Sequence, residues 1–209
     1  MQNEGHKIPK KLHLVWVGDR ECPRDWILSW RDKHPNWDFY LWNEQNIIGF
    51  ECQELIDWCL KNKIYAAVAD IVRYEVLYRF GGVAVDADSE CLIAIDELLD
   101  IKEDFFACYQ SEKYRPKLLS LQIGATKGNK LLRSIIDELK TRKEVINPWM
   151  DTGNLLLTCM VGGTKHDIKV YPSHYFIPEY ANGEKYEGSD NVFAVQKWYT
   201  TNKLYKKIK

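Results

Sequence analysis

The segment over residues 64–88 constrains the fold more than any other part of the chain. Apolar residues recur at helical spacing over residues 64–80, and Gly81 supplies the left-handed residue that commonly ends a helix. The chain then runs directly into apolar residues 83–85 and the triplet Asp86-Ala87-Asp88. In an extended chain alternate side chains share a face, so Asp86 and Asp88 should leave the end of a strand together. The segment predicts a helix that leads into a buried strand carrying two carboxylates.

Strand and helix signals also alternate before this segment. Residues 12–17 form a compact apolar run, and Pro23 opens a helical stretch that closes near Pro35. Residues 38–42 indicate a second strand and residues 51–62 a second helix. Two β-then-α units in succession favour an α/β fold with a largely parallel sheet. Four further strands and one helix are expected near residues 104–109, 119–125, 169–171 and 191–195, and near residues 129–142.

Composition and charge limit the classes of function. Lys and Arg total 29 against 30 Asp and Glu, a net charge of −1, so no basic field exists to hold a nucleic-acid backbone. The apolar run over residues 155–161 is too short to span a bilayer, and the first residues carry no export signal. Six cysteines without a Cys-x-x-Cys pair favour reduced thiols and a cytoplasmic location. Without a repeat or linker, we expect one domain over residues 1–209.

The triplet Asp86-Ala87-Asp88 is the first candidate site. Its carboxylate oxygens suit a hard divalent cation such as Mn²⁺ or Mg²⁺, which also accepts phosphate oxygens as ligands. A cation that bridges protein and diphosphate would take up charge as the diphosphate leaves. Taken alone, an Asp-x-Asp tripeptide is common and is usually a solvated turn.

Asp70 and Arg73 are a second candidate pair, three residues apart on one face of the predicted helix. A carboxylate there can accept hydrogen bonds from sugar hydroxyls, and a guanidinium can bind phosphate or hydroxyl oxygens. The alternative interpretation is an intrahelical salt bridge, worth only a few tenths of a kcal/mol.

The residues around these side chains carry a longer pattern. It comprises Ala69-Asp70-Ile71-Val72-Arg73-Tyr74, Leu77 and residues 81–88, preceded by residues 8–18, Trp30, Pro35 and Trp42. The pattern resembles the signature of family 32 glycosyltransferases, the DXD sugar transferases of capsule synthesis and Golgi mannosylation, and the large clostridial glucosylating toxins share this block. The second half matches only in outline, through Gly124-Ala125, Thr152-Gly153 and Tyr175-Phe176-Ile177-Pro178.

The resemblance implies a GT-A fold, with a Rossmann-like central mixed sheet flanked by helices. It implies a nucleotide-sugar donor, for which we expect a UDP-sugar, and a Mn²⁺ or Mg²⁺ cofactor. The sugar would be transferred, with retention of its anomeric configuration, to a hydroxyl of a glycan, a lipid-linked acceptor or another acceptor.

The resemblance also assigns roles to residues. Trp16 falls where similar enzymes stack the nucleotide base, with Val17 beside it, although a core aromatic at a strand end is an equally good interpretation of Trp16. Asp70 and Arg73 fall where the donor sugar is held. Asp86 would contact the ribose and sugar, and Asp88 would ligate the metal, with Asp86 as a further metal ligand. Asp86, Asp88 and Arg73 are therefore the catalytic candidates.

The chain departs from the family pattern in two places. Relatives usually carry Tyr where Ala84 stands, so this chain lacks one contact near the donor. Near the end, Trp198 fits the family pattern and Thr201 could supply a hydroxyl to the metal and diphosphate. Gln196, however, replaces a histidine in that pattern and Asn202 replaces a tryptophan, so the third protein contact is in question.

The last residues suggest two more expectations. Residues 195–209 are predicted to form a lid that closes over the donor, with a terminal strand or helix that completes the core as the alternative. The Lys-rich residues 203–209 could rest on an anionic membrane that holds lipid-linked acceptors, and a solvated, frayed terminus is the alternative.

Two other functional classes compete with sugar transfer. A haloacid-dehalogenase-type phosphohydrolase also places Asp-x-Asp after an apolar strand, with the first Asp as nucleophile, but Glu90 stands where that class needs Thr or Val. A catalytically decayed binding protein is the other class, suggested by Ala84 and Gln196.

Overall fold

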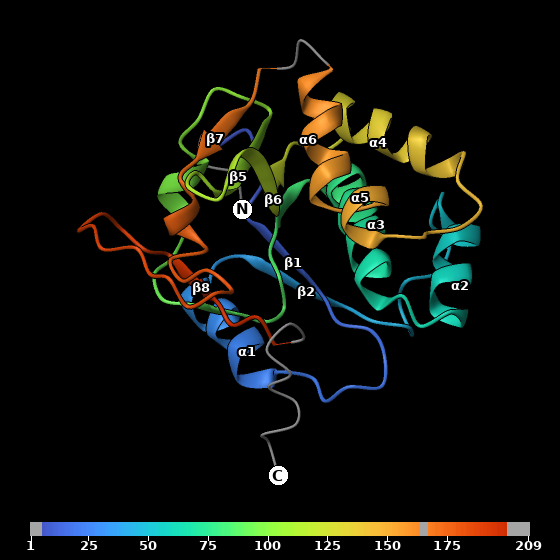
Figure 1. Ribbon diagram of the computed structural model, residues 1–209, viewed down its shortest axis with the longest axis horizontal. Helices are drawn as coiled ribbons and strands as arrows, with labels where there is room; N and C mark the ends of the chain where they lie inside the picture. The colour runs from blue at the N-terminus through green and yellow to red at the C-terminus, as the bar shows by residue number, and fades with distance from the viewer. Residues whose placement is uncertain (1–5, 164–166, 200–209) are drawn as a thin grey trace.

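The computed structural model describes residues 6–163 and 167–199, and a six-stranded mixed sheet forms its centre (Figure 1). The strand order is β2-β1-β3-β6-β5-β7. β1 pairs in parallel with β2 and β3, whereas β6 pairs antiparallel with β3 and β5. β5 and β7 are parallel again. The strands of this sheet span β1 (Lys11–Val15), β2 (Asp38–Trp42), β3 (Gly82–Ala84), β5 (Phe105–Ser111), β6 (Arg115–Ala125) and β7 (Lys169–Tyr171).

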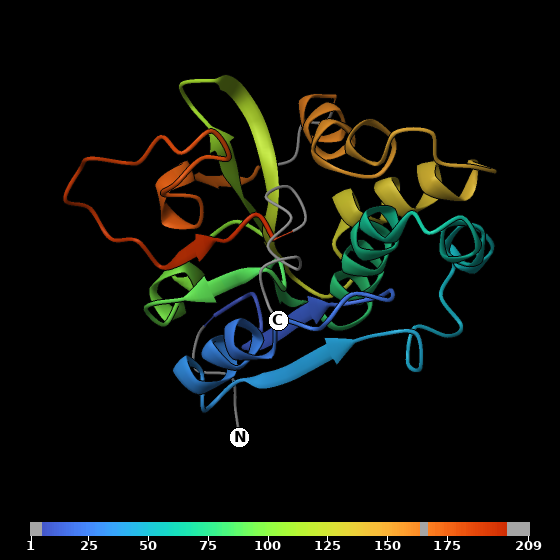
Figure 2. The same ribbon diagram turned by 60° about the horizontal axis from the view of Figure 1, so that its bottom comes forward.

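Helices cover both faces of the sheet, unequally. Figures 1 and 2 show α2 to α6 gathered on one side and α1 on the other. Residues of β5 alternate between two hydrophobic clusters: Phe105 and Ala107 belong to one, and Phe106 and Cys108 to the other. The helices span α1 (Arg24–Lys33), α2 (Gln53–Lys61), α3 (Tyr65–Phe80), α4 (Lys130–Lys140), α5 (Pro148–Asp151) and α6 (Asn154–Gly162), and two 3-10 turns span Asp96–Leu99 and Ser173–Tyr175.

The expected mixed α/β architecture is thus confirmed, and its sheet is parallel only in part. The first three strands follow the predicted β-then-α pattern and are parallel. The second half differs because β5 and β6 form an antiparallel hairpin of two long strands, which needs no crossover helix. Residues 155–161 belong to α6, a helix that the sequence analysis did not predict.

The strand predicted over residues 83–88 is shorter than expected. β3 ends at Ala84, Ala87 and Asp88 lie in a turn, and β4 (Ser89–Cys91) begins directly afterwards. Val83, Val85 and Ala87 nevertheless all pack in one hydrophobic cluster, while Ala84 packs in the other. The alternation of faces therefore persists beyond the last residue that is hydrogen-bonded as a strand.

A second, two-stranded sheet joins the end of the described chain to the acidic turn. β8 (Ala194–Gln196) pairs antiparallel with β4, so that Ser89 lies opposite Gln196. A strand was expected near residues 191–195, and β8 lies close to that range.

Two further sequence expectations concern helices and thiols. Within the described ranges, no helix is both long and apolar enough to cross a membrane. All six cysteines are free, as their spacing predicted.

Candidate active site

The candidate site lies where two parallel strands of the sheet end. Trp16 and Val17 follow β1, and Asp86 comes two residues after β3. The two strands are parallel neighbours, so these residues leave the same edge of the sheet. β1 lies between β2 and β3 in the sheet, so the chain continues from β1 to one neighbour and later returns to the opposite side of β1 as β3. The ends of β1 and β3 therefore form a topological switch point. Open α/β sheets bind ligands in the crevice at such points.

Asp86 is held from two directions. The Nη2 atom of Arg73 donates to Asp86 Oδ1 at 2.5 Å, and the Nε2 atom of Gln122 donates to Asp86 Oδ2 at 2.8 Å. The Gln122 amide also accepts a hydrogen bond from the backbone N–H of Asp86 at 3.1 Å. The Asp86 side chain remains 32% exposed, whereas that of Arg73 is 4% exposed. Asp86 is therefore a fixed carboxylate that can still contact a ligand.

Arg73 is the more deeply buried member of the ion pair with Asp86. Its Nε and Nη1 atoms are buried and have no hydrogen-bond partner among the described residues. Burial opposes the charge, but the carboxylates of Asp86 and Asp70 raise the pKa of Arg73 above its ordinary value. This buried cation can fix the Asp86 carboxylate and add positive potential to the site.

Asp70 lies one helical turn before Arg73 but has a different partner. The hydroxyl of Thr152 donates to Asp70 Oδ2 at 2.8 Å, and the Thr152 carbonyl accepts a hydrogen bond from Tyr74 at 3.0 Å. Within the described residues Arg73 forms its ion pair with Asp86 and not with Asp70, so the intrahelical salt bridge does not form. Burial, with a smaller contribution from Asp86, raises the pKa of Asp70 to about 7.

Asp88 is bound by the end of the described chain. Gln196 Nε2 donates to Asp88 Oδ1 at 2.8 Å, and the backbone N–H of Tyr199 donates to Asp88 Oδ2 at 2.9 Å. The backbone N–H of Lys197 donates to the Asp88 carbonyl at 2.8 Å. Burial, together with the neighbouring Asp86 carboxylate, raises the pKa of Asp88. The acidic triplet is therefore not a solvated turn.

These residues fit a hard divalent cation with an incomplete set of protein ligands. Across residues 6–163 and 167–199, no group of three or more His, Cys, Asp or Glu could hold a metal ion. The carboxylate of Asp88 has a neighbour of suitable chemistry, because the Oε1 atom of Gln196 is buried and has no hydrogen-bond partner there. Carboxylate and amide oxygens are ligands that Mg²⁺ and Mn²⁺ accept, with diphosphate oxygens completing the shell.

The expected lid begins as a packed strand. Val195 and Gln196 belong to β8, and Tyr199 is buried and donates its hydroxyl hydrogen to the Glu21 carbonyl at 3.3 Å. Residues 195–199 thus pack beside Asp88, and their closure over a donor stays a prediction. Residues 200–209, which include Thr201 and the Lys-rich segment, lie outside the described residues.

The aromatic candidates take different positions. Trp16 is half-buried, donates from Nε1 to the Arg20 carbonyl at 3.2 Å, and meets the Tyr199 ring edge-on at 5.6 Å. The side chain of Val17 is buried in the core, so only its backbone is suited to contact a donor. Trp198 has a left-handed backbone, φ 54°, and donates from Nε1 to the Glu179 carbonyl at 2.9 Å.

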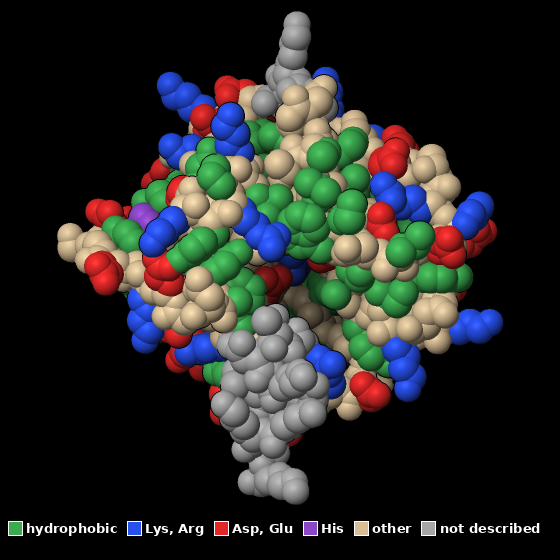
Figure 3. All heavy atoms as spheres, in the orientation of Figure 1, with side chains coloured by type: hydrophobic (Ala, Val, Ile, Leu, Met, Phe, Trp, Pro, Cys, Tyr) green, Lys and Arg blue, Asp and Glu red, His purple; other side chains and the backbone are tan. Residues whose placement is uncertain are grey.

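A small cavity of about 150 Å³ joins several of these groups. Asp70, Asp86, Gln196 and Trp198 all line it, whereas Trp16 and Val17 do not. The face drawn in Figure 3 is hollowed near its centre, with acidic and basic side chains inside the hollow. The structure therefore brings the two candidate carboxylates of the helix and the acidic turn to one cavity.

Sequence reasoning missed Gln122 and did not assign a role to Thr152. Gln122 is a buried polar residue in the middle of β6, between the core residues Leu121 and Ile123. A glutamine in such an apolar strand needs a hydrogen-bond partner, and that was the available signal. Thr152 had been noted only as part of the family outline.

Two parallel strands therefore end together at this site, and one of them leads into an acidic turn beside a buried arginine. Residues 23–105 match the family described as "Glycosyltransferase sugar-binding region containing DXD motif". The match confirms the resemblance to family 32 glycosyltransferases: the chain contains a glycosyltransferase sugar-binding region of the DXD type.

Two relatives extend this result. The chain is 30% identical over 103 residues to inositol phosphoceramide mannosyltransferase 3 of Schizosaccharomyces pombe, covering 46% of this chain and 29% of that protein. It is 25% identical over 188 residues to uncharacterized glycosyltransferase L373 of Acanthamoeba polyphaga mimivirus, covering 82% of this chain and 73% of that protein. The chain therefore spans less than a third of the first relative and most of the second.

A solved structure supports the fold. The PaToxG glycosyltransferase superposes with a TM-score of 0.62 at 17% sequence identity, covering 75% of this chain and 69% of that one. This likeness confirms the GT-A type of architecture. The family match and the solved structure thus agree on a DXD sugar-binding region within a fold of this type.

Proposed function

We propose that this protein is a metal-dependent, retaining hexosyltransferase that uses a nucleotide-sugar donor. A UDP-sugar is the first donor to test, and the mannosyltransferase relative makes mannose one of the sugars to include. The acceptor would be a hydroxyl of a glycan or a lipid-linked molecule. One observation carries the proposal: Asp88, bound by Gln196, lies in the turn beside Asp86, and Asp86 is bound by Arg73 and Gln122.

The proposed roles follow from these contacts. Asp88 and the free amide oxygen of Gln196 would hold Mn²⁺ or Mg²⁺, with Asp86 close by. A bound cation would neutralise negative charge on the departing diphosphate. Asp86, fixed by Arg73, would orient hydroxyl groups of the donor.

The remaining candidate roles concern the two ends of the donor. Trp16 would stack the base at the end of β1. Asp70, with its raised pKa, would accept a hydrogen bond from a sugar hydroxyl when it is ionised and donate one when it is protonated.

Retention is proposed to proceed by front-side substitution. The bond from the anomeric carbon to the diphosphate oxygen would break as the bond to the acceptor oxygen forms, and the acceptor proton would pass to the departing diphosphate. Asp86 is a poor nucleophile for a double displacement, because both of its oxygens accept hydrogen bonds from Arg73 and Gln122. NMR of the first product from an α-linked donor should show an α linkage, and a β linkage would exclude retention.

The competing functions have less support. A phosphohydrolase would need Asp86 as its nucleophile, and the same two hydrogen bonds oppose that role. A decayed binding protein would keep the hydrogen bond between Gln196 and Asp88 without turnover, so an assay of turnover separates it from a transferase. The cytoplasmic location and a membrane contact through residues 203–209 remain proposals, which cell fractionation with and without that segment can test.

A donor panel tests the proposed function. The purified protein would be incubated with UDP- and GDP-linked hexoses, with Mn²⁺ or with a chelator, and release of nucleoside diphosphate would be measured. We expect slow, Mn²⁺-dependent hydrolysis of one donor. Binding of nucleotide without turnover of any donor or acceptor would favour the decayed protein, and release of phosphate from monoesters would favour the hydrolase.

A further inference from the structure

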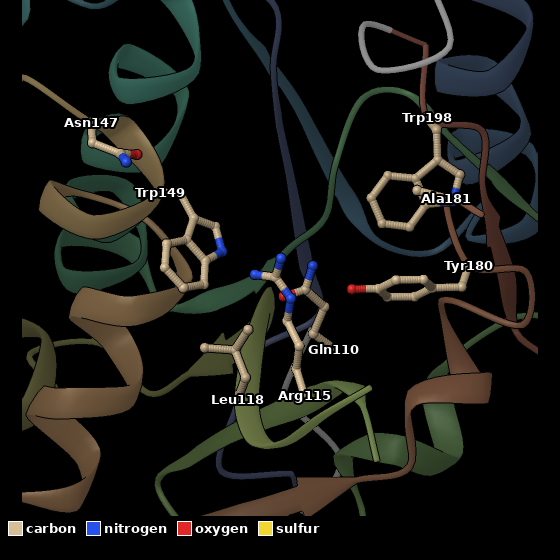
Figure 4. A pocket seen from close by; sticks show the side chains of 8 residues that line it. All are labelled: Gln110, Arg115, Leu118, Asn147, Trp149, Tyr180, Ala181 and Trp198. Carbon is tan, nitrogen blue, oxygen red and sulfur yellow. The ribbon is translucent and has the colours of Figure 1, made fainter. Parts of the chain in front are cut away.

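A second cavity, of about 780 Å³, opens beside the candidate donor site (Figure 4). Gln110 and Trp198 line both this cavity and the small cavity that holds Asp70 and Asp86. We call the larger one the Arg115 cleft, because Arg115 at the start of β6 projects into it. None of the roles proposed for the donor uses this cleft.

Arg115 lies over an aromatic ring and has no acidic partner among the described residues. Its guanidinium carbon lies 4.9 Å from the ring centroid of Trp149. Within residues 6–163 and 167–199, no carboxylate forms an ion pair with Arg115. Most other arginines there, such as Arg133 and Arg142, do pair with acids. A guanidinium that lies over an aromatic ring and pairs with no carboxylate is suited to bind an anion through two hydrogen bonds.

Aromatic rings stand on both sides of this guanidinium. Figure 4 shows Trp149 on one side of Arg115 and Tyr180 on the other. Trp149 is 36% exposed, and Tyr180 is supported by a stacked Tyr114 ring at 5.2 Å and an edge-on Trp198 ring at 5.8 Å. Rings of this kind offer flat apolar faces to a ligand that is itself hydroxylated at its edges.

The walls of the Arg115 cleft are tied to the donor site. Trp149 lies on α5, and α5 is followed by Thr152, the residue that donates to Asp70. Gln110 accepts a hydrogen bond from Asn154 at 3.2 Å, and both residues line the small cavity. A ligand in the cleft would therefore sit next to the group that is transferred.

We propose that the Arg115 cleft is the acceptor subsite, and that it selects a hydroxylated ring bearing a negatively charged group. The anion lies on Arg115 and the ring lies against Trp149 or Tyr180. A phosphate ester and a sugar carboxylate share this chemistry. The assignment of the cleft to the acceptor rests on the proposed transferase function, whereas the class of ligand follows from the residues of the cleft alone.

Binding of three matched sugars tests the ligand class. Glucose, glucose 6-phosphate and glucuronate would be titrated into the metal-free protein, and dissociation constants would be measured by calorimetry. We expect at least one anionic sugar to bind at least about tenfold more tightly than glucose, the effect of one charge-assisted hydrogen bond. A preference for glucose 6-phosphate would identify a phosphate acceptor, and a preference for glucuronate a carboxylate.

Variants locate the binding. Arg115→Gln should abolish the preference for the anionic sugar, and Arg115→Lys should keep part of it. Lys169→Gln is the matched control, because Lys169 is an exposed cation that also faces an aromatic ring, at 5.6 Å from the centroid of Tyr171, outside the cleft. Equal affinity for all three sugars, or a preference that survives Arg115→Gln, would overturn the inference.

A separate measurement distinguishes this inference from the proposed function. Binding of nucleoside diphosphate with Mn²⁺ should be the same in wild type and Arg115→Gln. If wild type binds no nucleotide and yet prefers anionic sugars through Arg115, the transferase proposal fails and the ligand class of the cleft stands. If nucleotide binds and the preference is absent, the cleft inference fails alone.

Discussion

The two halves of the sheet contribute to the site in different ways. The parallel half, β2-β1-β3, supplies Trp16, Asp86 and Asp88 from strand ends, and α3 supplies Asp70 and Arg73. The antiparallel half supplies one side chain, Gln122 on β6, and the separate two-stranded sheet supplies Gln196 on β8. The first half carries the charges that define the chemistry. Gln122 and Gln196 hold two of those charges, Asp86 and Asp88, in place.

The comparison predicts that the largest loss of activity follows when a charged side chain supplied by the parallel half is neutralised. Asp88→Asn keeps the size of the side chain but removes the negative charge that would hold the cation. Metal assistance is worth several kcal/mol, so Mn²⁺-dependent donor hydrolysis should fall by more than about a hundredfold. The measurement is the hydrolysis rate as a function of Mn²⁺ concentration.

A surface variant controls for this substitution. Asp104 is an exposed carboxylate paired with Lys7, and Asp104→Asn should leave the hydrolysis rate unchanged. Wild-type turnover in a well-folded Asp88→Asn protein would remove Asp88 from the metal site.

Trp16 gives the next largest expected effect. If it stacks the base, Trp16→Ala should weaken binding of nucleoside diphosphate by about 1–3 kcal/mol. Trp26→Ala is the matched control, because Trp26 also meets the Tyr199 ring edge-on, at 5.9 Å, but lies on α1. Calorimetry should show weaker binding only for Trp16→Ala, and equal losses in both variants would assign the effect to packing around Tyr199.

The sequence predicted the parallel half of the fold well. Its strands and helices follow one another closely, so local apolar spacing and turn residues mark most of their limits, as for β2 at Asp38–Trp42. The antiparallel pairing of β6 with β3 depends on contacts between residues far apart in the chain, such as Val83 with Gly124. α6 was missed because its apolar residues surround the helix and leave no one-sided pattern.

The site was predictable to the same extent. Asp70, Arg73, Asp86 and Asp88 lie within nineteen consecutive positions and form a recognisable pattern. Their partners do not, because Gln122 and Thr152 reach them only after the chain folds back. The pairing of Arg73 with Asp86 also required the structure, since helix spacing offered Asp70 as the nearer partner.

A substitution in the antiparallel half should therefore lower activity less, because it acts only through Asp86 of the parallel half. Gln122→Met keeps the length of the side chain but removes both of its hydrogen bonds to Asp86. Hydrogen bonds to charged groups are worth about 1.5–3 kcal/mol, and Arg73 still holds Asp86, so we expect roughly a tenfold loss of turnover. Steady-state kinetics should show the loss while Mn²⁺ affinity changes little.

Gln122 can also be tested for a purely structural role. Thermal unfolding would report any loss of stability in Gln122→Met. If turnover is unchanged while stability falls, Gln122 supports the core and not the orientation of Asp86.

The last prediction concerns Asp70, which accepts a hydrogen bond from Thr152, the residue that follows α5. Its pKa is about 7 in the folded protein against an ordinary value of 3.8, so between about pH 4 and pH 7 the folded state binds more protons than the unfolded state. The contribution of Asp70 to the free energy of unfolding should therefore fall as the pH rises through this window. One proton limits the slope to about 1.4 kcal/mol per pH unit.

Two variants isolate that contribution by urea unfolding at several pH values. Asp70→Asn cannot titrate, so its free energy of unfolding relative to wild type should increase from pH 4 to pH 7 and then become constant. Thr152→Val removes a hydrogen bond that lowers the pKa of Asp70, so the wild-type decline should extend to higher pH in this variant. A difference between Asp70→Asn and wild type that is independent of pH would mean that Asp70 is charged throughout. Arg73 and Thr152 would then stabilise the ionised carboxylate more strongly than burial opposes it.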